Sequence, residues 1–181
     1  MKEYTGGPFS DFEAASAAEY IVTNGSGAYS SSTVCGANTH RYHALLAAPL
    51  DDPPGTFVFL SSLEEVLDVG GARYFLSTGQ YPGTVYPDGY RYISSFRRNR
   101  VVEAVFEAGG VRVGRSVAMP PGSACVVVTW ELFTNRADVH LEVRPLCAFR
   151  DRHHLTRANP DADLSVEKTG RLVTVRPYAV L

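Results

Sequence analysis

The strongest constraint on the fold of this chain is a series of short apolar runs separated by clusters of Gly, Pro, Asn and Asp. Within 101–108, for example, the even-numbered positions are apolar, whereas Glu103 and Glu107 occupy the alternate face. A period of two is typical of a strand with one buried face. The runs recur roughly every 8–12 residues, which is the spacing of a sandwich or barrel. Parallel βαβ units need long helical crossovers, and none is evident. We therefore predict an all-β fold, an antiparallel two-sheet β-sandwich.

The predicted strands cover most of the chain. They are 20–22, 44–48, 56–60, 63–69, 72–76, 101–108, 111–119, 124–133, 138–146, 164–168 and 172–175. Gly70-Gly71, Gly109-Gly110 and Gly170 are expected to close hairpins. Arg115 interrupts the apolar face of its strand and marks either an edge or a functional position. One short helical turn is expected over 13–18, and the glycine-rich residues 1–10 are expected to be frayed.

One stretch, 77–99, does not fit the strand pattern. It carries five aromatic residues among Gly and Pro, namely Tyr81, Tyr86, Tyr90, Tyr92 and Phe96. A connection of this length is uncommon in a compact domain unless it is functional. Tyrosine combines an apolar ring with a polar tip and suits a surface such as that of a sugar ring. Two interpretations follow, a carbohydrate-binding platform and a loop folded onto its own aromatic side chains.

Composition excludes several classes of function. The net charge is −2 and no basic stripe is present, so no nucleic-acid partner is expected. No apolar run approaches the roughly 20 residues of a membrane-spanning helix, and the N-terminus does not resemble a signal peptide. We expect no membrane partner and a cytoplasmic location. The three cysteines are widely spaced, which argues against a disulfide framework and predicts small buried apolar residues.

No cofactor, metal or catalytic group is predicted. Gly25-Ser26-Gly27 lacks the third glycine of a dinucleotide fingerprint. Four histidines could in principle bind a metal, namely His40, His43, His153 and His154, but their spacing in the sequence does not require a metal site. Glycoside cleavage needs two carboxyl groups that flank the scissile bond. Glu64 and Glu65 are adjacent and would point to opposite faces of a strand, and nothing pairs the acids of the expected loops.

The most distinctive polar cluster lies within 19–48. Its turn Asn24-Gly25-Ser26-Gly27 is followed, after Thr39, by His40-Arg41-Tyr42-His43, where the strand 44–48 begins. In strand conformation, alternate side chains of this tetrapeptide would face opposite ways. At most half of the cluster would then serve a single pocket.

Residues 23–46 read T-N-G-S-G-A-Y-S-S-S-T-V-C-G-A-N-T-H-R-Y-H-A-L-L. This segment resembles the signature T-N-G-x-G-G-Y-x-x-x-T-x-x-G-x-x-T-R-R-Y-H-G-L-L of the N-terminal domain of bacterial and archaeal-type glycogen debranching enzymes, the amylo-α-1,6-glucosidase family. The resemblance continues through 60–65, 81–92, 119–120, 144–146 and 149–151. His40 stands where the signature has Arg, which removes a permanent charge and a bidentate donor. Ala28 and Ala44 stand where it has Gly.

The resemblance implies a supersandwich-like β domain placed before an (α/α)6-barrel. That barrel carries the carboxylates that hydrolyse α-1,6-linked glucose at branch points, and no part of this chain is helical enough to form it. Residues 1–181 are therefore expected to be a single accessory domain cut from a longer chain. Its implied partners are the C-terminal barrel of the same chain and an α-glucan such as glycogen or limit dextrin.

The resemblance also implies a set of residues at the glucan or at the domain interface. They are Asn24, Thr39, His40, Arg41, Tyr42, His43, Tyr86, Asp88, Tyr90, Arg91, Arg150 and Asp151. The alternative is a stand-alone carbohydrate-binding module for α-glucans, with 81–96 as its platform. A self-sufficient glycosidase is disfavoured because the helical catalytic domain is missing.

Overall fold

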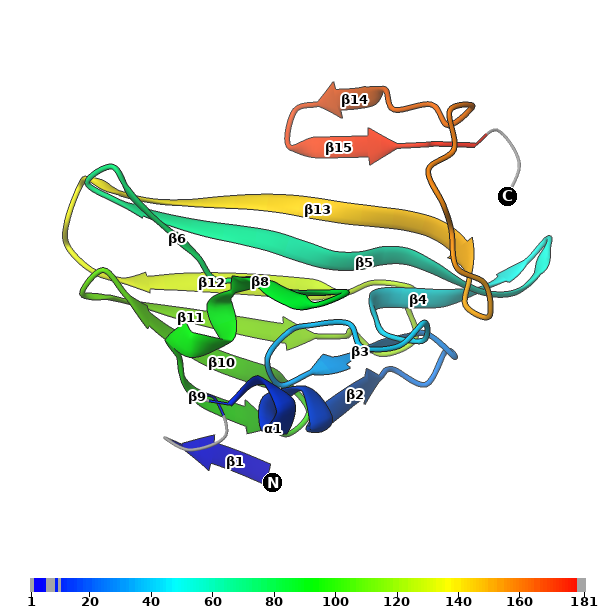
Figure 1. Cartoon of the computed structure of the whole chain (residues 1–181). Helices are drawn as coiled ribbons and strands as arrows, with labels where there is room; N and C mark the ends of the chain where they lie inside the picture. Colours follow the sequence, from blue (N-terminus) through cyan, green and yellow to red (C-terminus); the bar gives the residue numbers. More distant parts are fainter. Residues whose placement is uncertain (1, 6–8, 10, 179–181) are drawn as a thin grey trace.

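The chain folds into two antiparallel sheets that pack face to face, as the computed structural model shows (Figure 1). The structure describes residues 2–5, 9 and 11–178. The first sheet contains, in spatial order, β1 (Lys2–Thr5), β9 (Ile93–Arg98), β10 (Val102–Ala108), β11 (Val111–Ala118) and β12 (Val127–Phe133). The second contains β13 (Val139–Asp151), β5 (Pro54–Val69), β4 (Ala44–Asp51), β3 (Tyr29–Thr33) and β2 (Glu19–Thr23), with β6 (Ala72–Phe75) beside β5. The predicted all-β sandwich is confirmed.

Smaller elements complete the fold. The hairpins β7 (Thr78–Tyr81) with β8 (Thr84–Asp88) and β14 (Val166–Thr169) with β15 (Leu172–Val175) lie outside the two large sheets. Figure 1 shows the second hairpin apart from the sandwich, beyond β13. The described part of the chain includes the helix α1 (Phe12–Ala17) and the 3-10 turn η2 (Gly89–Tyr92). No helix in the described residues has the length and apolar character needed to cross a membrane.

The core lies between the two sheets and follows the predicted alternation. In β10, Val102, Ala104, Phe106 and Ala108 are all buried, as expected from their period of two. Tyr20 of the second sheet packs against Phe96 of the first, with ring centroids 5.9 Å apart. Burial of such apolar side chains contributes roughly 25 cal/mol per Å², so this interface is the main stabilising element of the fold.

A polar triad crosses the core between the sheets. Glu65 of β5 is only 1% exposed, and its carboxylate accepts from Arg115 Nη1 at 2.9 Å and from Trp130 Nε1 at 2.7 Å. Burial alone would lower the pKa of Arg115, but the charge of Glu65, its hydrogen bond and the nearby Tyr20 together raise it. The interruption of the apolar face at Arg115 therefore marks an internal ion pair, and Glu64 points outward as predicted.

Several strand predictions were wrong in extent. β5 is one strand of 16 residues, because it pairs with β13 on both sides of Ser61; a register shift at Ser61 is all that remains of the expected break. β13 likewise extends to Asp151 rather than ending at residue 146. The hairpins at Gly70-Gly71, Gly109-Gly110 and Gly170 are confirmed by the pairing of the flanking strands.

The stretch 77–99 is not a long loop. It contains β7, β8, η2 and β9, and β9 is an interior strand of the first sheet, between β1 and β10. Its aromatic residues divide accordingly: Tyr90 and Phe96 are buried in the core, whereas Tyr81 and Tyr86 are exposed. Gly89 is required in this segment, since a Cβ there would lie 2.2 Å from the Leu76 carbonyl group.

Two further expectations need correction. Residues 2–5 are not frayed, because they pair with β9; of the remaining N-terminal residues, 1, 6–8 and 10 lie outside the described part of the chain. Cys35 is buried as predicted, but Cys125 and Cys147 are exposed. Cys125 lies in the connection before β12, outside any strand. Cys147 lies at a register shift in β13, where side chains no longer alternate between the two faces of the sheet.

Candidate functional site

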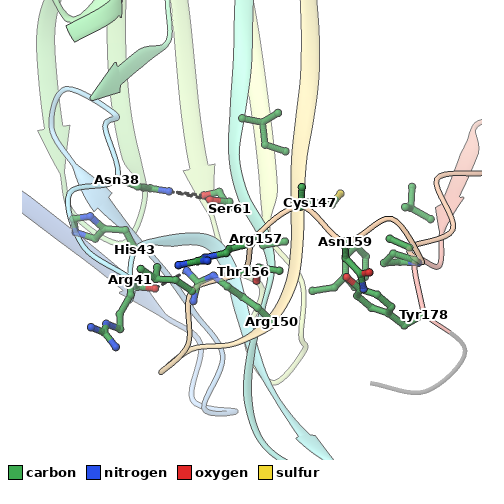
Figure 2. Close-up of a pocket in the computed structure, with 18 of the residues that line it drawn as sticks. Asn38, Arg41, His43, Ser61, Cys147, Arg150, Thr156, Arg157, Asn159 and Tyr178 are labelled. Atoms are coloured by element: carbon green, nitrogen blue, oxygen red, sulfur yellow. Dashed lines mark hydrogen bonds between the residues drawn. The ribbon is translucent and has the colours of Figure 1, made fainter. Parts of the chain in front are cut away.

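An open pocket of about 1020 Å³ lies where the β3–β4 connection, β5 and the end of β13 meet the segment that follows β13 (Figure 2). We call it the arginine pocket, because three guanidinium groups are among its lining residues. The lining includes Asn38, Thr39, His40, Arg41, His43, Ser61, Cys147, Phe149, Arg150, Thr156, Arg157, Asn159, Asp163 and Tyr178. Figure 2 shows Asn38, Arg41 and His43 on one side of Cys147, and Asn159 and Tyr178 on the other.

The first wall of the arginine pocket is a tight turn before β4. The His43 backbone N–H donates to the His40 carbonyl at 3.1 Å, and the Thr39 N–H donates to His43 Nδ1 at 3.1 Å. The tetrapeptide is therefore not the start of a strand, and its side chains do not alternate. Instead the rings of His40 and His43 stack with centroids 3.6 Å apart. The expectation that they would face opposite ways was wrong because the turn brings positions i and i+3 together.

The second wall is a distorted end of β13. The register with β5 shifts on both sides of Cys147, and Phe149 has φ = 47°, which is uncommon for a residue other than glycine. Bulges of this kind re-aim side chains at the ends of strands. Here the distortion precedes Arg150 and accompanies its approach to the β3–β4 turn.

Arg41 and Arg150 join the two walls through backbone carbonyl groups. Arg150 Nη2 donates to the Arg41 carbonyl at 2.6 Å, and Arg150 Nη1 donates to the His154 carbonyl at 2.8 Å. Arg41 Nη1 in turn donates to the His153 carbonyl at 2.8 Å. Burial lowers the pKa of Arg150, but guanidinium groups remain charged in proteins. The pocket therefore holds positive charge and oriented N–H donors.

His43 is a neutral donor inside this wall. Its side chain is fully buried, and burial lowers its pKa to about 4. Because Nδ1 accepts from the Thr39 N–H, the proton of the neutral ring is on Nε2. Glu19 Oε1 lies 3.6 Å from that atom and 3.3 Å from His40 Nε2. Within the described residues, His43 Nε2 has no partner at hydrogen-bond distance.

The same three side chains are spaced for a metal ion, but their chemistry does not fit one. The candidate ligand atoms of Glu19, His40 and His43 all lie within 4.8 Å of one another. A metal at His43 Nε2 would need the ring proton on Nδ1. Nδ1 already accepts a hydrogen bond from the Thr39 N–H. A proton on Nδ1 would break this hydrogen bond and place two donors, Nδ1–H and the Thr39 N–H, against each other.

The structure brings together part of the predicted site. Thr39, His40, Arg41, His43 and Arg150 all line the arginine pocket. Tyr42 and Asp151 lie at its margin and both contact His153: Tyr42 Oη is 3.4 Å from its Nδ1, and Asp151 Oδ1 accepts from its backbone N–H at 2.7 Å.

The other predicted residues do not line the arginine pocket. Asn24 joins two turns, because its side chain donates to the Ser123 carbonyl and accepts from Ser26. Asp88 and Arg91 form an exposed ion pair with 2.8 Å between Oδ2 and Nε. Tyr90 is buried and packs edge-on against Phe12, and Tyr86 lines a separate groove.

Many lining residues of the arginine pocket were not predicted from sequence. They include Asn38, Ser61, Cys147, Phe149, Thr156, Arg157, Asn159, Asp163 and Tyr178. Asn38 directly precedes the predicted cluster, and its Nδ2 donates to the Ser61 carbonyl at 3.0 Å, so its position beside Thr39 was a usable signal. The segment after β13 has no periodicity, and nothing local indicates that it folds back to this pocket.

Comparisons with known proteins identify the family. The family model described as "Glycogen debranching enzyme N terminal" matches residues 18–180, which is nearly the whole chain. Comparison with curated proteins and with solved structures gives no match. The matched region contains both walls of the arginine pocket, and the chain therefore belongs to the glycogen debranching enzyme N-terminal family.

Proposed function

We propose that this chain is the accessory N-terminal domain of a glycogen debranching enzyme, and that its arginine pocket borders the glucan site of a helical catalytic domain in the same polypeptide. The observation that carries the proposal is the convergence of Arg41, His43 and Arg150, from distant parts of the sequence, on one open pocket. Arg41 and Arg150 use part of their N–H donors on backbone carbonyl groups, and the remaining guanidinium donors suit the hydroxyl groups of a sugar or the acidic loops of a catalytic partner.

The acid content of the pocket supports an accessory role. Hydrolysis of a glycosidic bond uses two carboxyl groups that flank it. Among the described lining residues of the arginine pocket, only Asp163 carries a carboxylate, and that group accepts from the Ser165 backbone N–H at 2.8 Å. This composition is compatible with catalytic carboxylates supplied by another domain, as the proposal requires.

The first test uses the 181-residue chain by itself. We expect it to release no glucose from a limit dextrin, because it lacks a pair of carboxylates at the arginine pocket. Glucose release that is abolished by Asp88→Asn or Asp151→Asn would overturn the accessory role.

The second test uses the complete polypeptide that carries this domain and a catalytic domain. Arg41→Ala and Arg157→Ala should each raise KM for limit dextrin about fivefold, which corresponds to about 1 kcal/mol for a lost hydrogen bond. Arg112→Ala, on the first sheet and outside the arginine pocket, is the matched control and should leave KM unchanged. Wild-type kinetics in both folded pocket variants would refute the proposed position of the pocket.

The alternative, a stand-alone carbohydrate-binding module, predicts a different result. The isolated chain would then bind glycogen as tightly as the complete polypeptide does. Titration of the isolated chain and of the complete polypeptide with glycogen separates the two functions. If the arginine pocket only borders the catalytic site, the complete polypeptide should bind glycogen more tightly than the isolated chain does.

A further inference from the structure

A second concave surface lies on the outer face of the second sheet, beside the β7–β8 hairpin. It encloses about 430 Å³, within the range typical of small-ligand sites. We call it the aromatic groove. Its lining includes Glu64, Arg73, Phe75, Tyr81, Tyr86, Pro87, Glu142 and Arg144. None of these residues lines the arginine pocket, so the two surfaces are separate.

Exposed aromatic rings form one side of this groove. Tyr81 and Tyr86 are each 60% exposed and Phe75 is 37% exposed, although rings of this size are usually more buried. The centroids of Phe75 and Tyr86 are 6.2 Å apart. Grouped exposed apolar surface of this kind marks a binding site more often than scattered single residues do.

The Tyr81 ring lies close to the backbone of the hairpin at Gly79. A Cβ at Gly79 would lie 2.6 Å from the Tyr86 carbonyl oxygen and 3.1 Å from the Tyr81 ring. The absence of a side chain at Gly79 thus allows the Tyr81 ring to lie against the hairpin. A ring placed in this way loses little freedom when a ligand binds, which favours affinity.

A balanced network of charges forms the other side. Arg73 pairs with Glu142 at 2.9 Å, and Arg144 pairs with Glu64 at 2.9 Å and with Glu142 at 3.1 Å. Two guanidinium groups and two carboxylates leave no net charge, so neither an anion nor a cation is favoured. The network offers N–H donors and carboxylate acceptors together. A hydroxyl group both donates and accepts, and a ligand with several hydroxyl groups fits both kinds of partner.

Taken together, these features favour a neutral ligand with an apolar face and a rim of hydroxyl groups, which is the chemistry of a pyranose ring. We propose that the aromatic groove is a second α-glucan site, in which Tyr81 and Tyr86 stack on glucose units while the Arg73–Glu142–Arg144–Glu64 network binds their hydroxyl groups. The choice of an α-linked glucan over other sugars rests on the proposed function. The site holds substrate away from the reaction and carries out no chemistry.

The test measures binding by the 181-residue chain. Its migration in native gels that contain glycogen is compared with migration in gels without it, and maltoheptaose is titrated calorimetrically. We expect wild-type protein to be retarded by glycogen. The double variant Tyr81→Ala/Tyr86→Ala should weaken association about tenfold or more, as loss of an aromatic anchor does. Phe133→Ala, which removes an exposed ring of β12 outside the groove, is the matched control and should bind as wild type.

Unchanged retardation of the folded double variant would overturn the proposal, as would the absence of any binding by wild-type protein. Equal loss in the Phe133→Ala control would also overturn it, because the effect would then not be specific to the groove. This outcome is independent of the arginine pocket. Binding that depends on Tyr81 and Tyr86, with normal kinetics in the Arg41 and Arg157 variants, would support the groove and refute the proposed function; the opposite pattern would refute only the groove.

Discussion

Replacement of Glu65 by glutamine tests the polar triad in the core. The Glu65 carboxylate is 1% exposed and accepts from both Arg115 and Trp130. Glutamine has nearly the same volume but only one acceptor oxygen, so its NH2 group must face one of these two donors. The Arg115 guanidinium, whose side chain is 14% exposed, then loses its counter-charge. Breaking a buried pair from one side costs about 3–5 kcal/mol.

The assay is urea unfolding at pH 7, followed by the fluorescence of the single tryptophan and by circular dichroism. In thermal unfolding, a loss of about 4 kcal/mol in the free energy of unfolding corresponds to a fall in Tm of about 8–16 °C for a domain of this size. The adjacent Glu64→Gln is the matched control, because Glu64 faces outward and its pair with Arg144 is exposed. That variant should lose less than about 1 kcal/mol.

A compensating variant completes the test. Glu65→Leu/Arg115→Met removes both charges and should recover most of the loss, since apolar replacements of buried ion pairs are often neutral or stabilising. Equal losses for Glu65→Gln and Glu64→Gln would refute the reasoning. So would a double variant as unstable as Glu65→Gln alone, because the cost would then not arise from an unpaired charge.

Three further predictions concern local features. Burial lowers the pKa of His43 to about 4 in the folded protein, from a reference value of 6.5. Between these values the unfolded chain binds more protons, so the free energy of unfolding should fall by about 3 kcal/mol as pH drops from 6.5 to 4. His43→Asn, which can still accept from the Thr39 N–H, should abolish this part of the pH dependence in urea titrations. Gly89→Ala should lower the Tm by several degrees, because its Cβ would meet the Leu76 backbone at 2.2 Å; an unchanged Tm would contradict this close approach. Asp11→Ala should cost about 1 kcal/mol in thermal unfolding, since the Asp11 carboxylate accepts from the first N–H groups of α1; a neutral effect would mean that the cap does not contribute.

The elements predicted correctly are those that local periodicity determines. Val102 and Phe106 alternate with polar residues, and Gly109-Gly110 permits a tight turn, so the β10–β11 hairpin follows from adjacent positions alone. The helical turn near residue 13 is also local, because Asp11 caps it.

The features that were missed depend on partners distant in sequence. Ser61-Ser62 was predicted to separate two strands, but β5 pairs with β13 on both sides of Ser61, with Ser62 opposite Leu146 and Leu60 opposite Cys147. Strand β9 is an interior strand because β1 and β10 flank it, and its own sequence does not reveal this. In the arginine pocket, the turn that stacks His40 on His43 and the bulges before Arg150 are backbone irregularities. Sequence identified five of the lining residues, which are Thr39, His40, Arg41, His43 and Arg150, but neither the contribution of the segment after β13 nor how these residues approach one another.

The two register shifts in β13 have a consequence for how firmly its arginines are positioned. Arg144 of the aromatic groove lies opposite Glu64 in the regular part of the ladder with β5. The ladder becomes irregular between Leu146 and Cys147 and again between Cys147 and Arg150. The register that holds Arg144 opposite Glu64 therefore does not fix the position of Arg150, which depends on the conformation of the intervening bulge.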